Sequence, residues 1–336
     1  MRPLWTMGLL LACGFSSAKS FAAPPITVEV TVNWEGRALQ APNVDALDRL
    51  RRTFPDIPVT HFINPVYFLD EAKAADNAAA LERVFTSQDE VGLYLAPMDT
   101  LVNEAGVMLK LSPTFWGYVD EGELCENDCG LDVPLTVYNR EDTLRLFSAA
   151  HRTLRQAGFS DLKSFAVRGW LEAPFLTQMA AALGYAYDLS PVDPVLVTSK
   201  LREFPISTWV SQRWGMLTQA DPATLQKLAQ SHPKVRPIPQ RGGILELNEQ
   251  REILARFDRM VKDKREDEVF TLSMSVESAF QSWPKLRMVL LGLTERAKKQ
   301  NITLRYTTVS GVKNSRPTAA NMRISTRFSQ QAEARK

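Results

Sequence analysis

The residues of this chain that could do chemistry come directly after its short apolar segments. The set comprises Asn33, Glu35, Asn64, Tyr94, Arg168, Asp188, Ser275 and Glu277. Carboxylates can bind a cation or transfer a proton, and an arginine can neutralise or orient an anion. Because the carboxyl ends of parallel strands meet at one edge of a sheet or barrel, these side chains are expected to converge on one site.

Aromatic residues accompany this polar set, namely Trp34, Trp116, Tyr118 and Trp170. An aromatic face beside polar groups suits a sugar ring, whose C–H groups pack on the π surface while its hydroxyls form hydrogen bonds. Each aromatic residue alone fits a core position better than a binding site. The whole set at the strand ends favours a carbohydrate-binding site.

Strand and helix patterns alternate along most of the chain. Apolar, β-branched runs predict strands at 26–32, 57–63, 91–95, 163–167, 185–189, 243–247, 269–274 and 302–306. Helical patterns lie between them, including one that Asn43 would cap, one that Asn139 would cap and one from Pro284 to Gln300. The alternation predicts an α/β fold, a single distorted (β/α) barrel of about seven units. The segment from Pro97 to Thr136 breaks the rhythm and is expected to form a long functional loop over the carboxyl edge.

The two ends of the chain differ from this body. Residues 1–22 have a basic start, an apolar stretch and the small residues Ser20 and Ala22 before a cleavage site, which is typical of a secretory signal peptide. A lipoprotein signal at Cys13 is the alternative. Residues 23–310 form the predicted barrel, and residues 311–336 a basic disordered tail. We therefore expect a periplasmic or secreted protein without a transmembrane span.

Charge and cysteine content limit the classes of partner that the chain is expected to bind and the compartment in which it works. The chain has 40 basic and 38 acidic residues, and without residues 1–22 and 311–336 it has 32 basic and 37 acidic ones. A net negative body argues against nucleic acid as the main partner. Cys125 and Cys129 lie in an acidic loop, where export predicts a local disulfide. That loop could hold Ca²⁺, but its spacing favours a solvated acidic loop.

Several ordered motifs between Ile26 and Tyr306 resemble the polysaccharide deacetylase family, carbohydrate esterase family four. The matching stretches are Val32-Asn33-Trp34-Glu35-Gly36-Arg37, 54–65, Glu90 to Met98, Ser164 to Trp170, Tyr187-Asp188-Leu189-Ser190 and Met274-Ser275-Val276-Glu277-Ser278. The resemblance implies a distorted barrel and N-acetylated glycans as the ligand class. It also implies metal-assisted hydrolysis of an acetamide, in which a carboxylate and two histidines hold the metal.

This chain departs from that pattern at the catalytic positions. Asn33 stands at the position of the base, Tyr94 and Ala96 at those of the two metal histidines, and Ser275 at that of the acid histidine. The retained positions are Glu35, Arg168, Trp170, Asp188 and Glu277. The three histidines, His61, His151 and His232, lie elsewhere, and His61 in the middle of a strand is expected to be a core residue.

The sequence thus predicts an exported deacetylase-like barrel with a degenerate centre that binds an N-acetylated envelope or extracellular polysaccharide. No cofactor is expected, and a divalent metal only if the protein is active. Two alternatives stay open. One is an active carbohydrate deacetylase with an altered site, in which Glu35, Asp188 and Glu277 would hold a cation. The other is a structural envelope protein that uses its basic tail.

Overall fold

The structure, a computed structural model, describes residues 25–114, 128–168, 176–189, 202–203, 208–209, 245–262 and 269–312. The expected signal segment, nearly all of the basic tail and His232 lie outside these residues. Among the helices of the described residues, none is both long enough and apolar enough to cross a membrane.

A parallel sheet forms the centre of the molecule. In the described residues its strand order is β6-β5-β4-β3-β2-β1-β8-β7, and β9 also pairs with β1. The strands are β1 (Ile26–Trp34), β2 (Val59–Ile63), β3 (Glu90–Leu95), β4 (Ser164–Val167), β5 (Tyr187–Asp188), β6 (Arg202–Glu203), β7 (Thr208–Trp209), β8 (Val269–Ser275) and β9 (Leu304–Thr307). The curled parallel sheet confirms the predicted α/β class and the distorted barrel.

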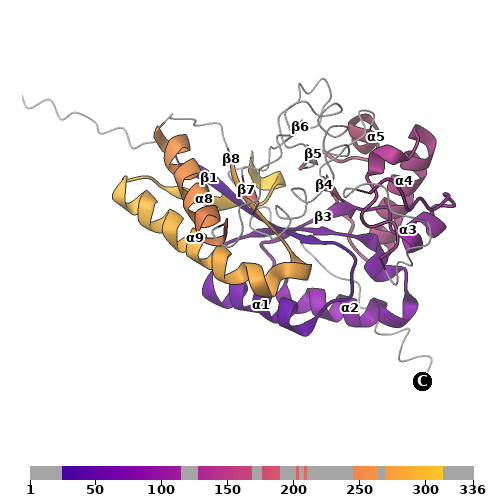
Figure 1. Ribbon diagram of the computed structural model, residues 1–336, viewed down its shortest axis with the longest axis horizontal. Coiled ribbons are helices and arrows are strands. Elements are labelled where there is room, and N and C mark those ends of the chain that lie inside the picture. Colours follow the sequence, from indigo (N-terminus) through magenta and orange to yellow (C-terminus); the bar gives the residue numbers. More distant parts are fainter. Residues whose placement is uncertain are drawn as a thin grey trace, which may run out of the picture.

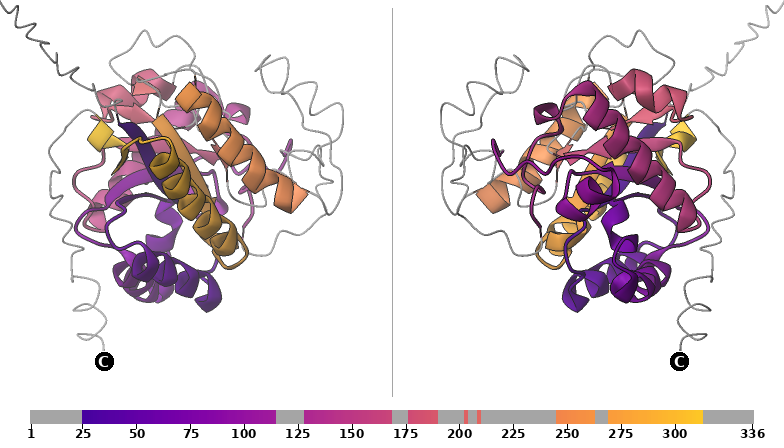
Figure 2. Two further views of the ribbon diagram at one scale, coloured as in Figure 1. Left: turned by 90° about the vertical axis from the view of Figure 1, so that its left-hand side faces the viewer. Right: turned by 90° about the vertical axis from the view of Figure 1, so that its right-hand side faces the viewer.

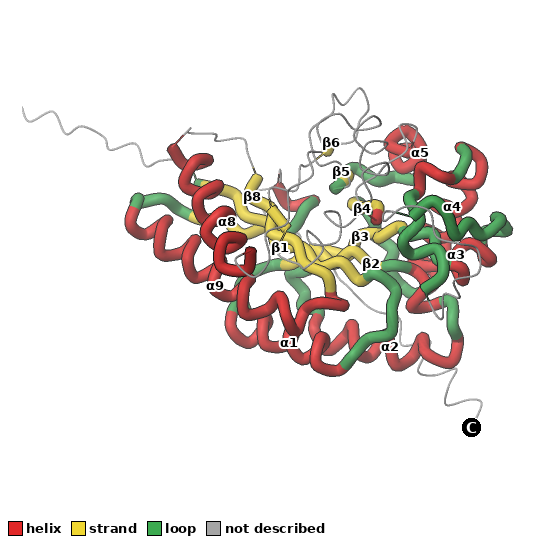
Figure 3. Tube along the Cα trace, viewed as in Figure 1, coloured by secondary structure: helices red, strands yellow, loops and turns green. Residues whose placement is uncertain are grey.

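Helices cover the outer side of this sheet (Figures 1 and 3). The α-helices are α1 (Ala41–Thr53), α2 (Glu71–Val84), α3 (Asp99–Glu104), α4 (Arg140–Gln156), α5 (Leu176–Ala182), α8 (Leu245–Lys262) and α9 (Ala279–Lys299). Short 3-10 turns are η1 (Pro65–Phe68), η2 (Leu135–Val137), η4 (Val276–Ser278) and η5 (Ser310–Val312). Two of them, η1 and η4, follow strand ends and carry site residues.

The alternation of side chains along β1 separates the core from the site. Val28, Val30, Val32 and Trp34 are buried in the hydrophobic core. Residues of the opposite parity, Glu29 to Glu35, face the inner side of the curled sheet, since successive side chains of a strand point to opposite faces. The inner face of β1 is therefore polar along its length, and its carboxyl end carries the candidate site, while Phe62 of β2, which pairs in register with Asn33, adds an aromatic side chain to the same face.

Two of the predicted elements are wrong in detail. The expected strand at 243–247 is helical from Leu245, the first residue of α8. The alternation in Leu245-Glu246-Leu247 imitates a strand, whereas Ile253, Phe257 and Met260 are buried at helical spacing further along the same element. The helix expected to begin at Pro284 begins at Ala279 and contains the proline.

The amino end of the inner face is closed by residues that follow β9. Glu90 accepts hydrogen bonds from Ser164 Oγ at 2.6 Å and from the backbone N–H of Ser310 at 2.7 Å. Val309 N–H donates to Thr60 Oγ1 at 3.0 Å. Two backbone donors thus bind the chain after β9 to the inner face, far from the carboxyl edge.

Candidate functional site

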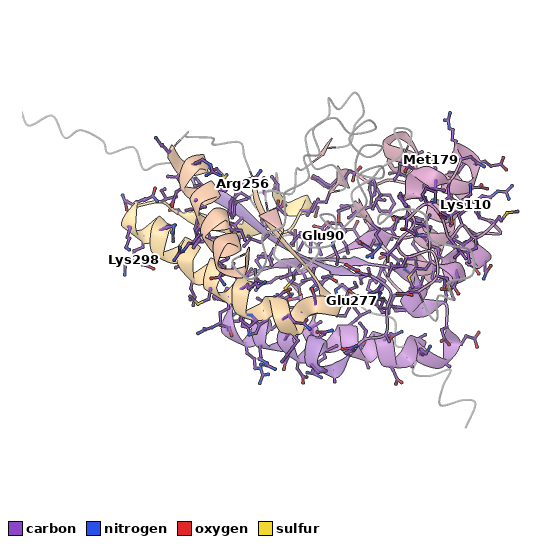
Figure 4. All side chains as sticks on the ribbon, viewed as in Figure 1. Glu90, Lys110, Met179, Arg256, Glu277 and Lys298 are labelled. Atoms are coloured by element: carbon purple, nitrogen blue, oxygen red, sulfur yellow. The ribbon has the colours of Figure 1, made fainter. Side chains whose placement is uncertain are left out.

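Glu277 is the centre of the candidate site. Its Oε1 accepts hydrogen bonds from the backbone N–H of Glu35 at 2.9 Å and from Tyr67 Oη at 3.0 Å, and its Oε2 accepts one from Ser275 Oγ at 2.6 Å. Burial, with the Glu277 charge, raises the pKa of Tyr67, so this phenol stays a donor. The half-buried carboxylate therefore joins the ends of β1 and β8 to η1 (Figure 4).

A buried ion-pair chain lies beside it. Arg168, which follows β4, donates from Nη1 to Glu35 Oε2 at 2.6 Å and from Nη2 to Asp132 Oδ1. Only 4% of the side chains of Arg168 and Glu35 is exposed, against 26% for Asp132. The guanidinium is therefore enclosed between two carboxylates, a geometry that its planar array of donors suits.

Two asparagines fix the backbone that carries Glu35 and Glu277. Asn64 donates to the backbone oxygen of Glu35 at 2.8 Å and caps η1. Asn43, expected to cap a helix, donates instead to the backbone oxygen of Glu277 at 2.9 Å and accepts from the backbone N–H of Phe280 at 3.0 Å. Helix α1 begins before it, at Ala41 with Gln40 as N-cap, so Asn43 lies within the helix and its amide holds η4 and α9.

The long connecting segment reaches this site through residues 128–133. Asp99 N–H donates to the backbone oxygen of Cys129 at 2.9 Å, and Arg37 pairs with Asp128 at 2.7 Å. Asp132 adds its pairing with Arg168. Residues 128–133 thus lie against the carboxyl edge, but α3 and η2 within the segment show that it is not a loop throughout. Asp128 and Asp132 are ion-paired, and the rest of the predicted solvated acidic loop lies outside the described residues.

Gly130 permits the close approach of this segment. It has φ +81°, and a Cβ would lie 2.2 Å from the backbone oxygen of Pro97. We expect Gly130→Ala to lower the free energy of unfolding by about 2 kcal/mol or more, because the left-handed conformation and the backbone clash both count against it. Gly184→Ala, with φ +93° and no atom within 4 Å, should cost about 1 kcal/mol. The free energies of unfolding of both variants can be measured by chemical denaturation. Equal losses in Gly130→Ala and Gly184→Ala would contradict the prediction, because the clash with Pro97 would then cost nothing.

Trp34 is not the sugar platform that the sequence suggested. It is 0% exposed, and its ring lies 5.9 Å from those of His61 and Phe85, measured between centroids. Its Nε1 donates to His61 Nδ1 at 3.0 Å. The alternation of β1 turns Trp34 away from its neighbours Asn33 and Glu35, into the core.

His61 is the satisfied core histidine that the sequence predicted. It is 1% exposed, and Asp89 Oδ2 lies 3.6 Å from its Nε2. Burial lowers the pKa of His61, so the ring is neutral and its Nδ1 can accept from Trp34. Arg51 Nη2 lies 2.5 Å from the same Asp89 oxygen, which makes this a structural cluster on the outer side of the sheet.

The remaining predicted site residues are all buried in the sheet. Asn33 pairs in register with Ser275 across β1 and β8, and both are buried. Tyr94 and Ala96 are buried at the end of β3. Asp188 is fully buried and pairs in register with Phe165, so it lies on the core side of the sheet and not on the inner face that carries Glu35, against the expectation that it joins the site.

The other expected site residues are outside the described part. These are Trp116, Tyr118, Trp170 and Cys125. Cys129 is disulfide-bonded, and its partner also lies outside, so the pairing with Cys125 stays a prediction. Among the side chains that the structure describes, no three of the His, Cys, Asp and Glu type gather as a metal-binding group.

Comparison with known proteins supports the fold and nothing finer. No family model and no curated protein sequence matches this chain. The crystal structure of a candidate polysaccharide deacetylase from Mycobacterium smegmatis matches with a TM-score of 0.52 and 10% identity, covering 86% of this chain and 89% of the other. The fold is that of a polysaccharide deacetylase.

Two other solved structures match at lower scores. A family 4 carbohydrate esterase from Streptomyces lividans has a TM-score of 0.38 and 12% identity, covering 80% of this chain and 90% of its own. A family 4 pseudoenzyme from Bacillus anthracis has a TM-score of 0.33 and 9% identity, covering 86% and 66%. Scores below 0.5 support no further conclusion.

Proposed function

We propose that this chain is an exported deacetylase-like protein that binds an N-acetylated polysaccharide of the envelope or the extracellular space without hydrolysing it. The observation that carries the proposal is the buried contact of Arg168 with Glu35 and Asp132. A fixed guanidinium neutralises the carboxylate at the very edge where the family resemblance places a divalent cation. The centre is thus held together by its own side chains.

The donor set does not fit a divalent metal. The two positions that the resemblance assigns to histidine ligands carry Tyr94, which offers a phenol, and Ala96, which offers a methyl group. The nearby carboxylate of Glu35 has its Oε2 2.6 Å from a guanidinium nitrogen. Zinc and similar ions take imidazole, carboxylate or thiolate ligands. The positive charge of Arg168 would also repel a divalent metal ion bound next to it.

The groups expected to move protons are altered as well. Asn33 has no basic site at neutral pH, and Ser275 uses its hydroxyl to donate to Glu277. Glu277 in turn accepts from Tyr67 and from the backbone N–H of Glu35. Each of these contacts favours a rigid site over proton transfer, because every named carboxylate oxygen of Glu277 already has a donor within the protein.

A glycan remains the best-supported ligand class for this edge. The curled sheet matches a protein named as a polysaccharide deacetylase, which supports a glycan as the ligand. The aromatic residues proposed to line the carboxyl edge are Trp116, Tyr118 and Trp170. Trp34 is excluded because it is buried in the core. Export follows from the signal-like residues 1–22.

Calorimetric titration of the full mature chain with peptidoglycan fragments, chitin oligosaccharides and exopolysaccharide tests the proposal. We expect saturable binding to at least one of them, lost in Trp170→Ala and kept in Leu144→Ala, a matched change of an exposed apolar residue on α4. We also expect no acetate release, with or without added zinc. Absence of binding across the panel contradicts the proposal, and acetate release abolished by Glu277→Gln would establish an active deacetylase instead.

A further inference from the structure

Helices α8 and α9 form one outer face of the molecule. They lie side by side in Figure 2, where the left view looks onto this face. Their close contact depends on Gly292, because a Cβ there would lie 2.9 Å from Leu254. Arg296 Nε also donates to Asp258 Oδ2 at 3.1 Å across the pair. The two helices therefore present a continuous surface.

Exposed apolar side chains gather on α9. Phe280 is 50% exposed, Met288 51% and Leu291 42%, and Pro284 between them is also exposed. Their spacing of 4, 4 and 3 residues places them on one side of the helix, over about 16 Å of its length. We call this set the apolar stripe. Elsewhere in the described residues the large exposed apolar side chains are Met108 and Leu144, which stand apart.

Basic side chains lie on the same two helices. Those that are exposed, apart from Arg256 on the side of α8 away from α9, are Arg251, Arg259 and Lys262 on α8 and Arg287, Lys298 and Lys299 on α9. Figure 4 labels Lys298 at the carboxyl end of α9 and Arg256 beside the middle of α8. We call the six residues other than Arg256 the basic rim.

The acidic side chains described on the two helices are already paired. Asp258 bonds to Arg296, and Glu295 lies 2.7 Å from Lys299. Glu246, Glu249 and Glu252 occupy the first part of α8, and their side chains are outside the described set. Over their full lengths the two helices carry nine basic and five acidic residues, so a net positive charge accompanies the apolar stripe.

We propose that the apolar stripe and the basic rim dock this protein on an anionic lipid surface. Helices that lie in a membrane interface place Phe, Leu or Met in the acyl boundary and Lys or Arg at the headgroups, and neither signal alone holds firmly. Both signals are present here on one face. The inference is independent of the glycan proposal, since it uses none of the residues of the candidate site.

The dimensions of the face favour lipid over a protein partner or a polyanion. The apolar stripe is one helix wide, whereas a stable protein interface needs about 800 Å² from each partner with an apolar centre. A polyanion would satisfy the basic rim but would leave half-exposed Phe280, Met288 and Leu291 in water. An anionic bilayer covers both kinds of side chain together.

Co-sedimentation of the full mature chain with vesicles tests this. We expect binding to vesicles of phosphatidylcholine with one-third phosphatidylglycerol, and weaker binding to phosphatidylcholine alone or at high salt. Met288→Gln with Leu291→Gln should lower the partition constant at least about tenfold, because both side chains lose apolar transfer energy. The matched control is Met108→Gln with Leu144→Gln, which has the same chemistry on other faces and should change nothing.

A second pair of variants tests the charge. Arg259→Glu with Lys262→Glu should abolish the preference for phosphatidylglycerol, while Lys73→Glu with Lys163→Glu, exposed residues outside α8 and α9, should keep it. Binding that is equal in all these variants would overturn the proposal and assign lipid affinity to another part, such as the basic tail. Absence of vesicle binding by the wild-type chain would overturn it as well.

Discussion

Replacing Arg168 by methionine is expected to lower the free energy of unfolding by about 3–5 kcal/mol at pH 7. The change leaves the carboxylate of Glu35, of which 4% is exposed, without its guanidinium partner, and leaves Asp132 nearby with the same sign of charge. Truncating one partner of a buried pair is costly because the other charge stays desolvated. Urea denaturation followed by circular dichroism measures the loss.

Arg152→Met is the matched control for this prediction. Arg152 pairs with Glu104 at 2.8 Å, but 51% and 41% of the two side chains are exposed. Such pairs contribute about 1 kcal/mol or less. The double variant Arg168→Met with Glu35→Gln should be less destabilised than Arg168→Met alone. Similar small losses for Arg168→Met and Arg152→Met would mean that Arg168 is not the buried neutralising cation of the site.

Replacing Glu29 by glutamine is expected to stabilise the protein at alkaline pH. Burial raises the pKa of Glu29 from 4.5 to about 8; the hydrogen bond from Thr271 opposes this rise, and the charge of Glu90 adds to it. Because the folded pKa is above the unfolded one, the folded state binds the extra proton. The wild-type chain should therefore lose stability as the pH rises from about 4.5 to about 8.

The size of this effect follows from the shift. One pKa unit corresponds to about 1.4 kcal/mol, so Glu29 accounts for a loss on the order of 5 kcal/mol across that window. Glu29→Gln should remove most of the slope, being close to wild type near pH 4.5 and more stable by several kcal/mol at pH 9. Glu295→Gln, an exposed counterpart, should leave the slope unchanged. A wild-type slope that persists in Glu29→Gln would refute the assignment.

The fold and the backbone of the site could be predicted from local patterns. Parallel strands follow from the alternation of β-branched runs and helices, and the carboxyl ends of such strands meet by topology. That is why Glu35, Arg168 and Glu277 were expected together and lie together. Trp34 was misassigned although β1 held the signal: if Asn33 and Glu35 face inward, the residue between them must face the core.

The rest of the site depends on contacts between distant parts of the chain. Asn43 and Tyr67 meet Glu277 across 234 and 210 residues, and Asp132 meets Arg168 across 36. A single sequence does not show which partner a polar residue will find at such separations. An asparagine before a helical pattern fits the local role of an N-cap, which is why the sequence predicts that role for Asn43. Its actual role, binding the backbone of Glu277 and Phe280, arises only when α1 packs against α9.

The metal content of the purified full mature chain is the most direct test of the central claim. The protein would be incubated with zinc, desalted, and measured by inductively coupled plasma mass spectrometry beside its Arg168→Met variant. Since Arg168 supplies the positive charge at Glu35, and Tyr94 and Ala96 supply no imidazole, we expect far less than one zinc per chain. Stoichiometric zinc in the wild-type chain, lost on Glu35→Gln, would contradict a self-neutralised, non-catalytic centre.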